Sequence, residues 1–232
     1  MSAWNLVKSG EYESAIALLT EEAAHAPSTA VFNNRGMAQL HLGRYDAALA
    51  DFRAAEEATI AVSGGACDGA LCGVAHWMAG REEEAILTWA DGVRVSIKGA
   101  VIYADLAGGV TVGNLLMFGA AIRRDAGATE LAAKLLKKRL RTKQATSWPG
   151  PASRYLMGEL SRDALLSAVS QTAVLHERQL CQAHFYIGVR AFSGGDALFY
   201  STEIKQALGY GRVAKLGAEY YLALHELEQK RA

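Results

Sequence analysis

Two stretches of the sequence carry residue types that could do chemistry. His176 and Glu177 begin the zinc-protease motif H-E-x-x-H, in which two histidines on one helix face hold the metal, but the second histidine is missing. The run GGVTVGN, residues 108–114, could offer backbone amides to a phosphate, yet no P-loop lysine follows and the spacing G-x-G-x-x-G is absent. We therefore expect loop glycines there, and we expect His184 and His225, each alone in a helical pattern, to be core or surface residues.

The cysteines point to no metal site and no disulfide framework. Cys67, Cys72 and Cys181 form an odd set, and the C-x4-C spacing of the first two matches no common zinc motif. We expect all three to be reduced and buried, which favours a cytoplasmic location. The start, MSAWNLVKSGEYES, lacks a basic region followed by an apolar stretch, so no signal peptide is expected. No metal or other cofactor is predicted.

The composition indicates a large helical core. The chain has 232 residues, 51% of them hydrophobic, and only three prolines interrupt its helical patterns. The most apolar segment, residues 99–122, is interrupted by Asp105 and by glycines. We therefore predict that this segment is part of the core and does not span a membrane.

An internal repeat supplies the elements that must position any site. The segments GEYESAIALL, GRYDAALADF and GREEEAILTW start at intervals of 33 and 37 residues. Each begins with a glycine, has an alanine five residues after it, and has a bulky residue four residues after the alanine. This spacing fits one helix hairpin per repeat, with a turn at the glycine and small residues where the two helices touch. The shared positions are Gly10, Gly43 and Gly80; Ala15, Ala48 and Ala85; Leu19, Phe52 and Trp89; with Gly36 and Gly73 seven residues before the second and third turns.

This pattern resembles the tetratricopeptide repeat (TPR) family. The resemblance implies an all-α chain, folded as a TPR-like superhelix of antiparallel helix hairpins with a C-terminal capping helix. Weaker repeats follow, with expected turns near Gly127 and Gly195, and Tyr200 stands where the pattern expects a small residue. We expect this tyrosine to push its two helices apart or to turn outward.

The repeats divide the chain into four segments of one continuous body. Residues 1–92 hold repeats one to three, residues 93–114 form a Gly-rich insert, residues 115–145 hold repeat four, and residues 146–232 hold the WPGP segment, repeat five and the capping helix. The chain is expected to bend at the insert and at WPGP, because both break the period and neither is long or polar enough for a free linker.

In TPR superhelices the first helix of each hairpin lines the inner, concave face. By this resemblance, exposed aromatic and methionine side chains would form a groove for a partner protein, because such residues dominate interface cores. The alternative is a short superhelix that closes on itself and buries them. The positions concerned are Asn33, Met37 and His41; Val74, Trp77 and Met78; Arg124; and Phe185, Val189 and Phe192.

Charge is unevenly distributed although the net charge is zero. Residues 1–92 hold thirteen acids and five bases, a net charge of −8, whereas residues 93–158 hold three acids and eleven bases, a net charge of +8. Part of the basic excess is the run at residues 134–143, which ends a helix where cations are favourable and lacks the interleaved aromatics of a nucleic-acid site. The acidic run Glu82, Glu83 and Glu84 is expected at the superhelix edge, where it would steer a basic partner.

These features favour a non-enzymatic protein–protein interaction module. The preferred role is that of an immunity or inhibitor protein that binds and neutralises a bacterial toxin, with a basic toxin domain as the expected partner. The first alternative is an adaptor or assembly chaperone that holds a peptide in the concave groove, and the second is an enzyme that uses the Gly-rich insert. Neither nucleic acid nor a membrane is expected as a partner, and self-association into a homo-oligomer is left open.

Overall fold

The protein is helical throughout the part of the chain described by its computed structural model, residues 2–99, 101, 105–210 and 217–229. Thirteen α-helices and one 3-10 helix account for its regular structure there, and the only strand-like pairing among these residues is an isolated bridge between Ala66 and Val101. The predicted all-α class is therefore confirmed for the described residues. None of the described helices is both long and apolar enough to cross a membrane.

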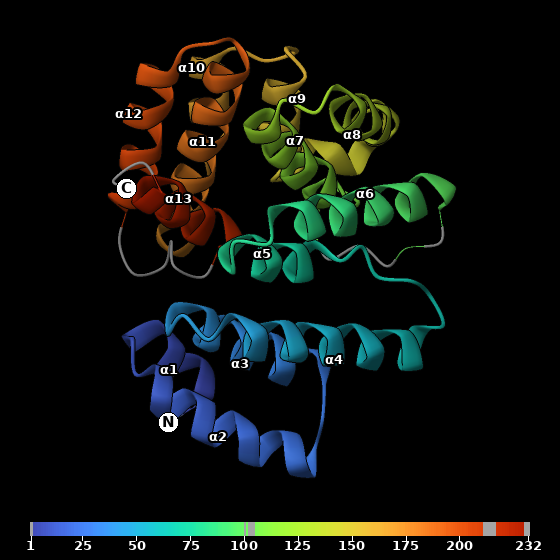
Figure 1. Ribbon diagram of the computed structural model, residues 1–232, viewed down its shortest axis with the longest axis vertical. Helices are drawn as coiled ribbons and strands as arrows, with labels where there is room; N and C mark the ends of the chain where they lie inside the picture. Colours follow the sequence, from blue (N-terminus) through green and yellow to red (C-terminus); the bar gives the residue numbers. More distant parts are fainter. Residues whose placement is uncertain (1, 100, 102–104, 211–216, 230–232) are drawn as a thin grey trace.

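Five pairs of consecutive helices form hairpins, and the first four pack one on the next (Figure 1). They are α1 (Ala3–Ser9) with α2 (Tyr12–His25), α3 (Thr29–His41) with α4 (Tyr45–Ser63), α5 (Ala70–Met78) with α6 (Glu82–Lys98), α7 (Thr111–Arg123) with α8 (Ala126–Arg139), and α11 (Ala173–Ser193) with α12 (Ala197–Leu208). The remaining elements are η1 (Lys143–Thr146), α9 (Gly150–Leu156), α10 (Arg162–Ser167) and α13 (Ala218–Gln229).

The hairpin turns lie where the glycine spacing predicts them, with one exception. Gly43, Gly80 and Gly195 follow the first helices of their hairpins with φ of +71°, +75° and +87°, a backbone conformation that glycine adopts without steric cost. The fourth turn lies near Gly127, as expected, but this glycine does not make it. Arg124 makes that turn instead, with φ of +55°, and Gly127 lies inside the first turn of α8 because Asp125 caps the helix through the Ala128 amide.

In the α3–α4 and α5–α6 hairpins, the glycine of the first helix lies where the two helices touch, as the repeat predicts. A Cβ atom on Gly36 would lie 2.6 Å from the Phe52 ring, and one on Gly73 would overlap Nε1 of Trp89. Phe52 and Trp89 are at most 1% exposed. Each glycine therefore lets a large side chain of the second helix pack directly on the backbone of the first.

The fifth hairpin corrects the expectation for Tyr200. Its ring neither turns outward nor separates the helices; it is fully buried, 3.2 Å from where a Cβ on Gly188 would be. Its hydroxyl donates a hydrogen bond of 2.9 Å to Glu226 on α13. A large residue fits here because Gly188 leaves room for the ring and α13 supplies an acceptor for the hydroxyl.

The two segments expected to bend the stack run partly into helices. Residues 93–98 complete α6, residues 111–114 begin α7, and the WPGP segment leads directly into α9, so the expected limits of the insert, 93 and 114, fall within helices. Residues 100 and 102–104 of the insert lie outside the described part. After α8 the chain folds back, so that α11 packs against α7 and α9, while α13 packs against α5, α11 and α12 (Figure 1).

The close contact at Gly73 gives a stability prediction. Gly73→Ala should lower the free energy of unfolding by about 1–3 kcal/mol, because the added methyl group overlaps the Trp89 indole and forces the two helices apart. Urea unfolding monitored by circular dichroism measures the change. Gly127→Ala is the matched control: its nearest neighbour is the Asp125 carboxylate at 3.4 Å, so alanine should be neutral or add up to about 1 kcal/mol of helix propensity. Equal effects in the two variants would contradict the packing argument.

Candidate functional site

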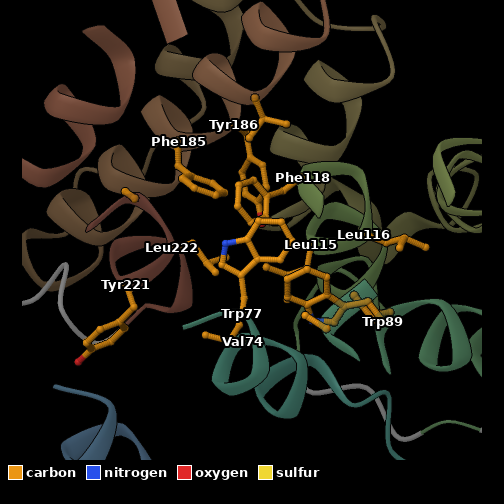
Figure 2. Close-up of a cluster of buried hydrophobic side chains, with 14 of the residues drawn as sticks. Val74, Trp77, Trp89, Leu115, Leu116, Phe118, Phe185, Tyr186, Tyr221 and Leu222 are labelled. Carbon is orange, nitrogen blue, oxygen red and sulfur yellow. The ribbon is translucent and has the colours of Figure 1, made fainter. Parts of the chain in front are cut away.

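The predicted inner face is the centre of the hydrophobic core. Figure 2 shows Trp77 of α5 surrounded by Leu115 and Phe118 of α7, Tyr186 of α11 and Leu222 of α13. The Trp77 ring lies 4.7 Å from that of Phe118 and 5.8 Å from that of Trp89. The expectation of an open groove is therefore wrong for the five of its residues that are at most 5% exposed, namely Val74, Trp77, Met78, Phe185 and Val189.

The groove is closed because α13 fills it. Nε1 of Trp77 donates to Oε1 of Glu226 at 3.3 Å, while the Tyr200 hydroxyl donates to Oε2 of the same carboxylate. Burial, and then the charge of Glu226, raises the pKa of Tyr200, so its hydroxyl stays protonated and able to donate. Two turns earlier on α13, Glu219 accepts a 2.9 Å hydrogen bond from Tyr186. Two acids of this helix, Glu219 and Glu226, are thus buried inside the protein.

The other expected contact residues are separated from one another. Asn33, Met37 and His41 lie half-buried on α3, and the His41 ring is 3.8 Å from that of Tyr12. Phe192 packs on Tyr200 at 4.9 Å, and Arg124 is exposed in the turn before α8. The structure therefore brings these residues to no common surface, although Asn33 lines a cavity.

The acidic run at the start of α6 is split between two environments. Glu82 forms an ion pair of 3.3 Å with Arg123 on α7, whereas Glu83 and Glu84 are exposed. Other exposed acids lie on earlier helices, among them Glu21 and Glu22 of α2 and Glu57 of α4. The acidic excess of residues 1–92 therefore reaches the surface on helices α2, α4 and α6.

Part of the basic excess has a structural role. Nζ of Lys138 donates to the carbonyl of Ile97 at 2.6 Å, and Nη2 of Arg139 donates to that of Ser96 at 2.7 Å. Both carbonyls lie in the last turn of α6, where unsatisfied acceptors and the helix dipole favour cations. The α8 cations thus fasten two neighbouring hairpins together.

The Gly-rich run does not leave its amides open to a phosphate. Oδ1 of Asp105 accepts hydrogen bonds from the amides of Ala107 and Gly109, and Oδ2 accepts one from Thr111, each at 2.9 Å. This carboxylate occupies the position that an anion would take at the start of α7. The prediction of loop glycines is confirmed for Gly108 and Gly109, which have positive φ, but is wrong for Gly113, which is buried within α7.

Two of the histidines weighed for chemistry, His176 and His184, are held by structural contacts. Nδ1 of His176 lies 2.7 Å from the carbonyl of Ser170, and Nδ1 of buried His184 lies 2.6 Å from Oε2 of Glu203. Glu203 also pairs with Arg162 at 3.1 Å, which ties α10 to α11 and α12. Among the described residues no group of three or more histidine, cysteine, aspartate and glutamate side chains could hold a metal ion.

A cavity that the sequence analysis did not anticipate lies between α3, α4 and the start of α5. It measures about 220 Å³ and is lined mainly by apolar atoms together with two carboxyl groups, Glu56 and Asp68. Burial raises the pKa of Asp68 to about 6 and, with the charge of Asp68 as a second cause, also raises that of Glu56. The full lining is Thr29, Asn33, Phe52, Ala55, Glu56, Thr59, Cys67, Asp68, Ala70 and Leu71.

The three cysteines are free thiols, as expected. Cys72 and Cys181 are buried, whereas Cys67 is half-buried at the cavity, which differs from the expectation that all three are buried. Burial raises the pKa of Cys72 to about 12, so this thiol stays protonated at neutral pH.

The chain matches no protein-family model, and no curated protein is similar enough to count as a match. Its function therefore has to be argued from its own residues.

The burial of Trp77 gives a prediction that distinguishes a core residue from a residue exposed in a groove. Trp77→Ala should lower the free energy of unfolding by about 3–5 kcal/mol, because it removes a fully buried ring and leaves Glu226 without one of its donors. Trp4→Ala, at a position 40% exposed, should cost far less in the same denaturant titration. A Trp77→Ala protein as stable as the parent would place the indole outside the core.

Asp68 gives a pH-dependent prediction. Its pKa is raised by folding, so its contribution to stability is complete below pH of about 4 and is lost as the pH rises through about 6. Asp68→Asn cannot ionise yet keeps an oxygen for the Ala70 amide. The variant should therefore exceed the parent in stability by roughly 1–3 kcal/mol at pH 8, with a smaller gain at pH 5. Thermal unfolding at the two pH values tests this, with exposed Asp91→Asn as a control that should show no such gain.

Proposed function

We propose that the chain is a non-enzymatic protein-binding module of the TPR type that recognises a basic protein through its acidic N-terminal half. The observation that carries the proposal is the exposure of acids on α2, α4 and α6, in a segment with a net charge of −8. Complementary charge steers association and selects among partners. Stacked hairpins support this use because they present several helices side by side over an extended surface.

Within this class we favour an immunity or inhibitor role in which the partner is a toxin with a basic domain, made by the same bacterium and neutralised in its cytoplasm. A rigid, charged surface suits that role because tight inhibitors are largely preformed for their targets. The adaptor that holds a peptide in a concave groove receives less support, since α13 already fills the space that such a peptide would take. An enzyme that uses the Gly-rich run receives less support too, because Asp105 occupies its amides.

Charge reversal at α6 tests the acidic surface. Once a basic partner has been isolated from the host by affinity capture, Glu83→Lys with Glu84→Lys should slow its association at low salt and reduce the salt dependence, with dissociation nearly unchanged. Glu82 is left intact because it pairs with Arg123. Surface binding kinetics at two salt concentrations give both rates.

The matched control reverses two exposed acids outside residues 1–92, with Glu130→Lys and Asp163→Lys. This variant should bind with rates close to those of the parent. If both double variants change association equally, net charge alone is responsible and the acidic surface has no specific role. Unchanged association in the α6 variant at low salt would remove the basic partner from the proposal.

A further inference from the structure

The cavity between α3, α4 and α5 has the features of a small-molecule site. Pockets that bind small ligands are mainly apolar and carry a few convergent polar groups that fix orientation. Here Phe52, Ala55 and Leu71 supply apolar wall, while Asp68 and Glu56 supply carboxyl groups. A cavity of about 150 Å³ is enough to hold benzene, so about 220 Å³ accommodates a ring with a short polar tail.

The two cavity carboxyl groups form no close ion pair within the described chain, although the charge of Arg53 and a hydrogen bond from the Gly69 amide partly stabilise ionised Glu56. Asp68 is only 7% exposed, and neither Asp68 nor Glu56 forms an ion pair with a described lysine, arginine or histidine. Two other buried carboxylates of the described chain are ion-paired instead, Asp51 with Arg35 and Glu203 with Arg162. Placing two acids in one cavity is unfavourable without a cation, because each is desolvated and they repel one another.

The cavity wall also offers an unused hydrogen-bonding group. Asn33 makes no side-chain hydrogen bond to any described residue, whereas Thr29 and Thr59, on the same wall, satisfy one another at 2.8 Å. The amide of Asn33 is therefore available to a ligand that carries its own donors. Asp68 keeps one oxygen on the Ala70 amide at 3.1 Å, which fixes the carboxyl group in place at the start of α5.

We propose that this cavity binds a small primary amine, with its ammonium group facing Glu56 and Asp68 and its apolar body packed on Phe52 and Leu71. An ammonium group carries three donors, which suits two carboxyl groups and an amide oxygen. It also neutralises the charge that the cavity holds. A neutral ligand of the same shape would leave the carboxyl groups uncompensated, and an anion would be repelled.

Isothermal titration calorimetry of the full chain with 2-phenylethylamine at pH 8 tests the site. The amine should bind, 2-phenylethanol should bind at least tenfold more weakly, and 3-phenylpropionate should show no heat of binding. No binding of the amine at millimolar concentration, or equal binding of the alcohol, would overturn the proposal. N-acetyl-lysine amide tests whether the natural ligand is instead the lysine side chain of a protein. If this compound binds more tightly than 2-phenylethylamine, the cavity receives a lysine side chain and the small-molecule assignment is wrong.

Variants separate the cavity from general surface charge. Glu56→Gln and Asp68→Asn should each weaken amine binding at least tenfold, and Asp68→Asn keeps the acceptor for the Ala70 amide, so its fold can be checked by circular dichroism. Glu57→Gln is the matched control, because it removes one charge from the neighbouring, exposed position of the same helix. It should bind within twofold of the parent. Equal losses in Glu57→Gln and Glu56→Gln would show that only bulk charge matters.

The pH dependence has a defined sign. The amine stays protonated between pH 5.5 and 8, since alkylammonium groups titrate near pH 10, whereas Asp68 becomes ionised over this range. Affinity should therefore rise about fourfold from pH 5.5 to pH 8 through Asp68 alone, and this rise should vanish in Asp68→Asn. Affinity that falls with rising pH would contradict the site. The titratable and charged groups that influence this carboxyl group or its neighbour Glu56 are Glu56 and Arg53 of α4, Cys67, Cys72 of α5, and Asp105.

Discussion

Two buried carboxylates on α13 hold the C-terminal helices against the earlier hairpins. Glu226 accepts hydrogen bonds from Trp77 of α5 and Tyr200 of α12, and Glu219 accepts one from Tyr186 of α11. A carboxylate in an apolar interior costs several kcal/mol unless its oxygens are hydrogen-bonded, so α13 is favoured only in the position and register that meet these donors. Hydrophobic contact alone would allow α13 to shift along its axis, whereas hydrogen bonds from the side chains of Trp77, Tyr186 and Tyr200 fix its position.

This placement decides which surfaces remain for recognition. With α13 and α11 packed on the inner side of α5 and α7, the aromatic residues there contribute to stability and are closed to a partner. Among the described surfaces that remain open are the charged exterior of the first three hairpins and the cavity beside α3. The two differ in their physics, because exposed acids act at long range and are screened by salt, whereas the cavity acids are desolvated and respond to pH.

Helix α4 carries both an exposed acid and a cavity carboxyl group. Glu57 is exposed to water, whereas Glu56, the preceding residue of α4, lines the cavity. A single turn of one helix therefore holds both an acid that attracts cations at long range and a carboxyl group confined in a cavity. Cations fasten helix ends, as where Lys138 and Arg139 donate to the last carbonyls of α6. Charge in this protein is thus divided between surface, cavity and helix ends.

The sequence by itself determined the features that depend on near neighbours in the chain. The glycine, alanine and aromatic spacing predicted the first three hairpins and the contacts of Gly36 and Gly73, because helix periodicity relates residues only a few positions apart. Tertiary structure alone decided the rest. The partner of Trp77 lies 149 residues away on α13, and the cavity joins residues of three helices with the loop before α5. No spacing rule connects such positions, since which helix fills the inner face depends on the fit of whole surfaces and on the hydrogen bonds that become available once they meet.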